Sequence, residues 1–88
     1  MEETLDEYII KRVNHEMKIL DEKRCDFTIL RDTAYTLGLK DKTNQIEFEH
    51  LVQVANTRVE IQEEKIEKLI AQYTAEYNRL RLEELTNQ

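Results

Sequence analysis

Glu47 and His50 are the two residues whose types and spacing come closest to a chemical site. They form a Glu-x-x-His sequence, the spacing at which a helix offers two ligands to a di-iron centre inside a helical bundle. Such a centre needs both side chains to point inward, with further carboxylates on the other helices. Phe48 occupies the expected buried position of this segment, so Glu47 and His50 are expected to face solvent. At the same spacing the first half of the chain has only Arg12-x-x-His15. We therefore expect no metal ion and no cofactor.

The remaining reactive side chains are not spaced for catalysis. Cys25 is the only cysteine, and His15 lies ten residues before it. On one helix this separates the two by ~15 Å, which is too far for a nucleophile and its base. The chain has no Ser-His-Asp set and no Cys-x-x-Cys pair, and its single glycine excludes a glycine-rich phosphate loop. The sequence therefore predicts that the protein is not an enzyme.

Acidic residues gather in the second half of the chain. The cluster consists of Glu60, Glu63, Glu64 and Glu67. One interpretation is a solvated helix face, supported by a pair between Glu64 and Lys68 one turn apart. The other is an acidic docking surface for a basic partner protein, because opposite potentials steer association.

The overall charge bears on partners and on location. The chain has 19 acidic and 13 basic residues and a net charge of −6, which repels nucleic acid and anionic lipid. No stretch has the ~18 to 20 consecutive apolar residues that a membrane span needs, and the acidic start of the chain does not resemble a secretion signal. A lone cysteine fits a reducing compartment. We expect a cytoplasmic protein without membrane contact.

A seven-residue repeat predicts the element that positions these side chains. One helical position is filled by Val52, Val59, Ile66, Tyr73 and Leu80, and the companion position by Phe48, Ala55, Gln62, Leu69 and Glu76. This spacing forms an apolar stripe along a helix, here called the seam, which is buried against another helix. Gln62 interrupts the seam. It either fixes the alignment of the helices as a buried amide or lies at the seam's edge with its amide in water.

The first half of the chain predicts a second long helix. Thr4 and Glu7 form a capping box at its start, and its apolar stripe consists of Leu5, Ile9, Val13, Leu20, Phe27 and Ala34. Gly38 suits a left-handed C-cap. Asn44 with Glu47 forms a second capping box, and Thr43 is the alternative cap.

These signals predict an all-α protein, because the chain has no proline and is rich in helix-forming residues. We expect one domain over residues 1–88, with helices over about residues 4–37 and 45–85 and a turn at 38–44. A short turn between long helices favours an antiparallel hairpin. The expected register pairs Ala34 with Phe48, Phe27 with Ala55, Leu20 with Gln62, Val13 with Leu69, Ile9 with Tyr73 and Leu5 with Tyr77. A shift by seven residues would still pair apolar with apolar residues.

The hairpin leaves apolar side chains without an expected partner. On the flanks of the two helices these are Ile10, Met17, Ile19, Ile29, Leu30, Tyr35, Leu51, Val54, Ile61 and Ile70. Residues after Tyr77 extend past the start of the first helix. Apolar patches of this kind mark interfaces, so we expect homodimerisation into a four-helix bundle. The candidate interface residues are Leu51, Val54, Ile61, Tyr73, Tyr77, Leu80, Leu82 and Leu85.

The expected function is that of a non-enzymatic protein-binding module, a small acidic helical regulator, inhibitor or assembly factor with an unidentified partner protein. The alternative is a hairpin-dimer RNA-binding protein that uses the basic residues of the first helix, Lys18, Lys23, Arg24 and Arg31. Acidic residues interleave with these, which weakens their field. An acidic mimic of nucleic acid, blocking a nucleic-acid-binding protein, stands between the two.

Overall fold

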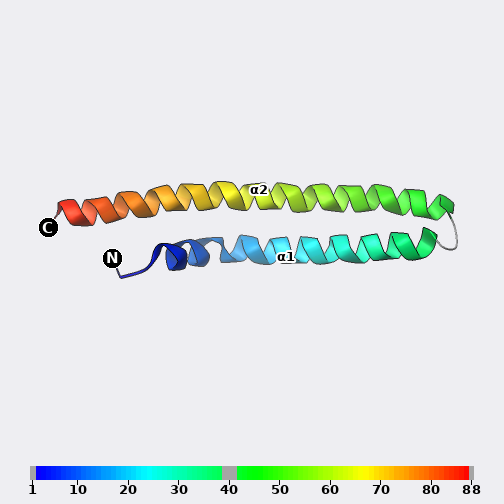
Figure 1. Cartoon of the computed structure of the whole chain (residues 1–88), viewed down its shortest axis with the longest axis horizontal. Helices are drawn as coiled ribbons and strands as arrows, with labels where there is room; N and C mark the ends of the chain where they lie inside the picture. The colour runs from blue at the N-terminus through cyan, green and yellow to red at the C-terminus, as the bar shows by residue number, and fades with distance from the viewer. Residues whose placement is uncertain (1, 39–41, 88) are drawn as a thin grey trace.

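The chain forms an antiparallel hairpin of two long helices, α1 (Leu5–Gly38) and α2 (Lys42–Thr86), which lie side by side along their whole shared length (Figure 1). The computed structural model describes the backbone of residues 2–38 and 42–87 and the side chains of residues 2–37 and 46–87. Within these residues there is no strand. The molecule measures 70 × 16 × 13 Å. The predicted all-α hairpin is confirmed.

Thr4 begins the first helix in the predicted way. Its Oγ1 accepts a hydrogen bond from the backbone N–H of Glu7 at 3.2 Å, and its carbonyl accepts one from the N–H of Tyr8 at 3.0 Å. The first bond satisfies one of the four backbone donors that a helix leaves open at its start. The acidic side chains of Asp6 and Glu7 in the first turn also suit the positive end of the helix dipole.

The predicted caps at the turn are wrong. Gly38 is the last residue of α1, so the helix includes the residue that was predicted to follow it. Glycine can take right-handed helical angles as well as left-handed ones. Thr43 and Asn44 lie in the first turn of α2 instead of before it, because no residue from 42 to 45 breaks a helix. Leu39 and the residues up to 41 lie outside the described part.

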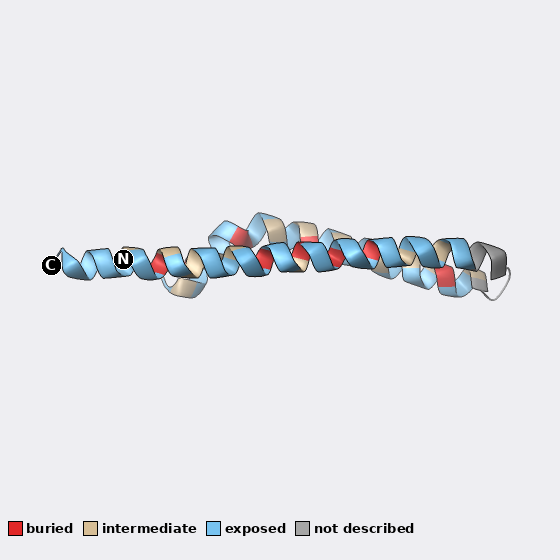
Figure 2. Ribbon diagram, turned by 90° about the horizontal axis from the view of Figure 1, so that it is seen from above, coloured by how far each residue is buried: buried red, intermediate tan, exposed pale blue. Residues whose placement is uncertain are grey.

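The core is the single line of contact between the two helices. Its buried apolar residues are Tyr8, Val13, Leu20 and Ala34 on α1 and Ala55, Val59, Ile66 and Tyr77 on α2. Figure 2 shows the buried positions of both helices as red bands between exposed ones. At the centre Leu20 packs with Val59 and Ile66, and Phe27 lies against this cluster. The seam predicted by the seven-residue repeat therefore forms the core, as knobs-into-holes packing requires.

Contacts across the hairpin follow the predicted register to within about one helical turn. Near the middle, Lys65 Nζ lies 3.2 Å from Glu16 Oε1. At the open end, the hydroxyl of Tyr8 lies 2.6 Å from Glu76 Oε1. The alternative alignment, shifted by seven residues, is not the one formed.

We expect Leu20→Ala to lower the free energy of unfolding by about 2–5 kcal/mol, because it leaves a cavity in the narrow core. Leu20 is only 3% exposed, whereas Tyr35 is 71% exposed. The control Tyr35→Ala should therefore change the free energy by about 0.5 kcal/mol or less. Urea denaturation at one fixed protein concentration measures both. Equal losses for the two variants would contradict this account of the core.

Candidate functional site

The side chains that could bind a metal ion or act in catalysis all lie on the surface of the hairpin. Glu47, His50, His15 and Cys25 are exposed, so Glu47 and His50 point outward as predicted. Among the described residues no group of three His, Cys, Asp or Glu side chains is placed to hold a metal ion. None of these four residues lies in an enclosed site. The candidate sites are therefore surfaces.

Gln62 is the one polar side chain in the described core. It is 4% exposed, and its Nε2 donates hydrogen bonds to the backbone carbonyl of Glu16 at 2.9 Å and to Glu16 Oε2 at 2.7 Å. Lys65 Nζ lies 3.2 Å from the other carboxylate oxygen, Oε1. Of the two interpretations of Gln62, the buried amide is correct and the solvated edge position is wrong. The side chain is buried because Glu16, on the facing helix, supplies the acceptors that a buried amide needs.

This network shifts the ionisation of Glu16. The hydrogen bond from Gln62 and the one from Lys65 both favour the charged carboxylate, and they lower the pKa of Glu16 below its ordinary value. Partial removal from water opposes this shift but does not overcome it. Glu16 therefore stays ionised at the centre of the hairpin and holds Gln62 and Lys65 of α2 against α1.

Tyr73 and Tyr77, two candidate interface residues, lie inside the hairpin. Tyr77 is buried and Tyr73 half-buried; their ring centres lie 5.4 and 6.5 Å from that of Tyr8, in edge-to-face arrangements. The hydroxyl of Tyr77 donates to the carbonyl of Glu3 at 2.9 Å. Both rings therefore pack within the open end of the hairpin, and half-buried Tyr73 keeps part of its surface exposed. That the two tyrosines contact a partner stays a prediction.

Tyr8 is the core residue that the sequence analysis missed. Its ring lies under the guanidinium of Arg12, 3.4 Å from ring centre to Cζ, and its hydroxyl donates to Glu76. This hydrogen bond, together with burial, raises the pKa of Tyr8. The predicted stripe placed Ile9 in the core at this level, but Ile9 is only half-buried. A tyrosine next to a seam position reaches the core because its ring is long and its hydroxyl finds a partner.

The C-terminal end of α2 forms an overhang, defined here as residues 78–87. In Figure 1 the C-terminus extends beyond the N-terminus, so this part of α2 passes the start of α1. Leu80 is half-buried, whereas Leu82 and Leu85 are exposed. A shallow hollow on the same part of α2 is lined by Ala75, Asn78, Arg79, Leu82, Glu83, Thr86 and Asn87. The overhang thus presents two exposed leucines, Leu82 and Leu85, and Leu85 also lines a hollow with Glu2, Glu3 and Thr4.

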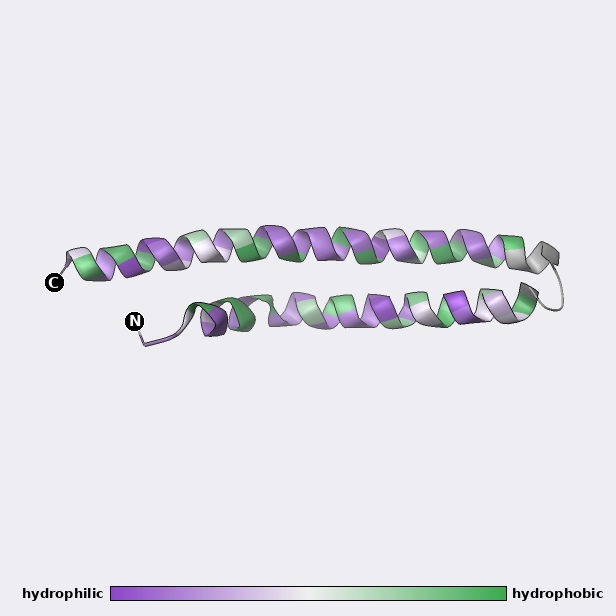
Figure 3. Ribbon diagram, viewed as in Figure 1, coloured by the Kyte–Doolittle hydropathy of each residue, from purple (hydrophilic) through white to green (hydrophobic). Residues whose placement is uncertain are grey.

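Leu51, Val54 and Ile61, the other candidate interface residues, are exposed on one flank of α2. With Arg58 they recur at alternating steps of three and four residues, so the four side chains form one stripe. Arg58 lines a groove of about 520 Å³ between the helices, together with Ile19, Glu22, Lys23, Asp26, Ile29, Leu30 and Ala55. The stripe therefore borders this groove, and apolar residues of both helices meet there. Bands of apolar colour recur along both helices in Figure 3.

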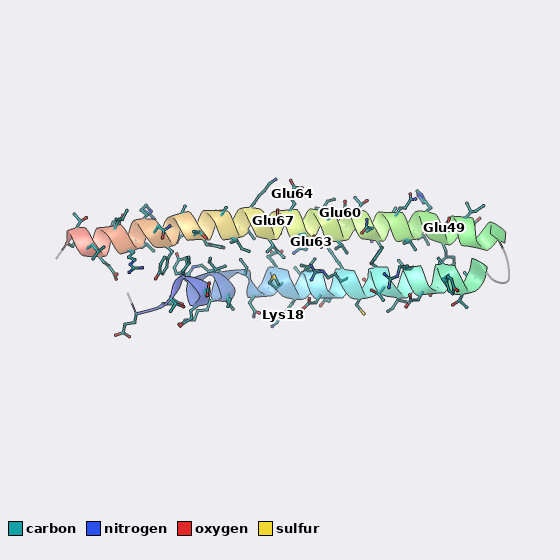
Figure 4. All side chains as sticks on the ribbon, in the orientation of Figure 1. Lys18, Glu49, Glu60, Glu63, Glu64 and Glu67 are labelled. Carbon is teal, nitrogen blue, oxygen red and sulfur yellow. The ribbon has the colours of Figure 1, made fainter. Side chains whose placement is uncertain are left out.

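The acidic cluster has contacts within the chain. Glu63 pairs with Arg24 at 3.4 Å, Glu64 pairs with Lys68 at 3.3 Å as predicted, and Glu60 accepts a hydrogen bond from Asn56. Figure 4 shows Glu64 on the outer side of α2 and Lys18 on the outer side of α1, so they face away from each other. Part of the negative charge of the cluster is neutralised locally.

Neither helix, in the range described, contains a segment long and apolar enough to cross a membrane.

Removing the charge of Glu16 should change how stability depends on pH. Because the folded-state pKa of Glu16 lies below its ordinary value, its contribution is fully present above the unfolded pKa of about 4.3 and is lost as the pH falls through the folded pKa. Glu16→Gln should therefore be less stable than the parent at pH 7 and closer to it at pH 3, as denaturation at both values would show.

The matched control for this prediction removes the donor. In a Gln62→Met background the carboxylate loses its strongest hydrogen-bond donor, so Glu16→Gln should have a smaller pH-dependent effect than in the parent chain. An identical effect in both backgrounds would show that Gln62 does not stabilise the charged form.

No protein-family model, no curated protein and no solved structure matches the chain.

Proposed function

We propose that the protein is a non-enzymatic interaction module that forms a homodimer and binds a partner protein, as a small helical regulator, inhibitor or assembly factor. The observation that carries the proposal is the amount of apolar surface on the outside of a two-helix molecule. Such surface on a chain of this size marks protein interfaces. The proposed setting is the cytoplasm, where a single exposed thiol such as Cys25 stays reduced.

The hairpin exposes more surface than a compact chain of its mass. Its accessible surface is 6863 Å², compared with roughly 5,500 Å² expected for a folded monomer of 10.6 kDa. Its radius of gyration is 20.0 Å, against about 12 Å for a compact domain of this length. The difference in area, about 1,400 Å², exceeds the roughly 800 Å² that each partner buries in a standard interface. Assembly with another chain through one such interface would remove a large part of this excess.

Two groups of exposed apolar residues on α2 suit two kinds of contact. The stripe of Leu51, Val54 and Ile61 borders the groove between the helices and suits a contact between copies. The overhang presents Leu82 and Leu85 as exposed side chains, with Glu2, Glu3 and Thr4 beside Leu85. Such an exposed apolar pair on a helix suits insertion into the apolar groove of another protein. We assign partner binding to the overhang.

The RNA-binding alternative receives less support from the contacts of α1. Arg24 pairs with Glu63 and Arg31 with Asp32, so two of the four basic side chains considered for RNA already face a carboxylate. Such pairs lower the positive potential that phosphate binding requires. The acidic mimic is weakened in the same way by the pairs of Glu63 and Glu64.

Leu82→Asp combined with Leu85→Asp should abolish partner binding and leave the hairpin folded, because both side chains are exposed in the described structure. Affinity recovery from lysate of the source cells measures binding, and circular dichroism measures the fold. A protein retained at near stoichiometric amount by the parent chain should be absent with the double variant.

The control for this experiment is Ile46→Asp, at an exposed apolar position near the other end of α2. It should retain the recovered protein. Unchanged recovery with the overhang variant would overturn the assignment of partner binding to the overhang.

A further inference from the structure

The groove between the helices has apolar side chains at both ends and charges of opposite sign in its middle. The register of the hairpin places Ile29 at the level of Leu51 and Val54, and Ile19 at the level of Ile61. Between these levels, Glu22 and Asp26 on α1 lie at the level of Arg58 on α2. One edge of this face is therefore acidic in the middle and the other basic.

The charged groups of the groove are free to meet a second molecule. Within the part of the chain that the structure describes, Glu22, Asp26 and Arg58 form no ion pair, and all three are exposed. Lys23 lies half-buried between the two acidic residues, and Lys65, the next basic residue on the α2 side, already binds Glu16. The α1 edge of the groove thus has two carboxylates around one ammonium group and is acidic on balance, whereas the α2 edge has the guanidinium of Arg58 and is basic.

The opposite flank of the hairpin has a different character. Arg31 lines a separate small hollow there with Ala34, Tyr35, Glu49 and Val52, and Arg24 on the same flank pairs with Glu63 across the helices. Ile10 and Met17 precede these arginines at steps of seven residues, so they share this flank. Charge pairs that are already closed within the chain leave less for a partner to bind. The groove face is the better interface.

Symmetry restricts how two groove faces can meet. Two copies related by a two-fold axis along the hairpin place α1 of each copy on α2 of the other, with residues of the same level facing. Arg58 then meets Glu22 and Asp26 of the second copy, and Ile61 meets Ile19. A two-fold axis across the hairpin instead places α1 on α1 and α2 on α2. Where the charged levels meet, this brings the acidic edge onto the acidic edge and Arg58 onto Arg58, which like-charge repulsion disfavours.

We propose that the groove face is a homodimer interface in which the two hairpins run in the same direction, with both turns at one end. The proposal rests on the homodimer of the proposed function and adds its face and its direction. The occupant of the groove is a second copy of this chain, because the face is self-complementary in charge and in apolar residues. The molecular surface in excess of a compact monomer is large enough for one interface of standard size.

The first test compares two isoleucines of nearly equal exposure on the two flanks. Ile61, on the groove face, is 59% exposed and Ile10, on the opposite flank, is 61% exposed. Sedimentation across a concentration series should give the mass of two chains for the parent protein. Ile61→Asp should raise the dissociation constant at least roughly tenfold, whereas Ile10→Asp should change it by about twofold or less, with circular dichroism confirming that both variants are folded.

The second test measures direction. Asn78, exposed near the open end, is changed to Cys in a Cys25→Ser background and spin-labelled. Hairpins that run in the same direction bring the two labels to one end, within about 30 Å, because helices in a bundle pack 8–10 Å apart. Hairpins that run in opposite directions and meet at Arg58 separate them by about 60 Å, because 20 residues lie on each side.

The outcomes separate the proposal from the function beneath it. A dimer that resists Ile61→Asp, or labels about 60 Å apart, would overturn the proposed face or direction and leave the homodimer standing. A parent chain that stays monomeric at every concentration would overturn both the homodimer and this interface. Neither result would affect binding of a partner to the overhang, which the leucine variants test separately.

Discussion

The hydrogen bonds from Gln62 to Glu16 are the interaction on which the alignment of the hairpin depends. Apolar packing alone tolerates a shift by one heptad, because the repeat continues along both helices and any such shift pairs apolar residues again. A shifted Gln62 would be buried without the carbonyl and carboxylate of Glu16, and a buried amide without a partner is unfavourable by about 1–3 kcal/mol. The polar residue therefore supplies the specificity that the apolar residues lack, as a buried amide does in coiled coils.

The two ends of the hairpin are held by different means. At the open end, Tyr8 and Tyr77 pack edge to face, and their hydroxyls reach Glu76 and the carbonyl of Glu3. These contacts tie the start of the chain to α2 across more than sixty positions of sequence. In the middle, Leu20, Val59 and Ile66 form a buried apolar cluster. One line of contact thus combines an apolar cluster at the centre, the hydrogen bonds of Gln62 that fix the alignment, and packed tyrosines at the open end.

The sequence was sufficient for the architecture because helix periodicity is a long-range pattern that many residues repeat. The seam through Val59 and Ile66 and the cap at Thr4 are of this kind. The start of the second helix was predicted too late, since Asn44 has a capping preference that the helix beginning at Lys42 overrides, whereas the first helix ends at Gly38, one residue beyond the predicted end. Tyr8 was missed because the pattern ranks positions, whereas burial of a tyrosine depends on what its hydroxyl can reach. The groove could not be predicted from the sequence, because its shape depends on how closely the two helices pack. The residues at its border, Leu51, Val54 and Ile61, were nevertheless identified as candidates for an interface.

The unequal lengths of the two helices have a consequence for the assembled protein. α2 has 45 residues and α1 has 34, so α2 extends beyond α1 at the open end. If both turns lie at one end of the dimer, the two overhangs lie side by side at the opposite end. A target with two matching grooves would meet the second overhang at an effective concentration in the millimolar range, whereas a target with one groove would gain nothing from the second overhang. The difference in helix length would then make the protein a selector for bivalent targets.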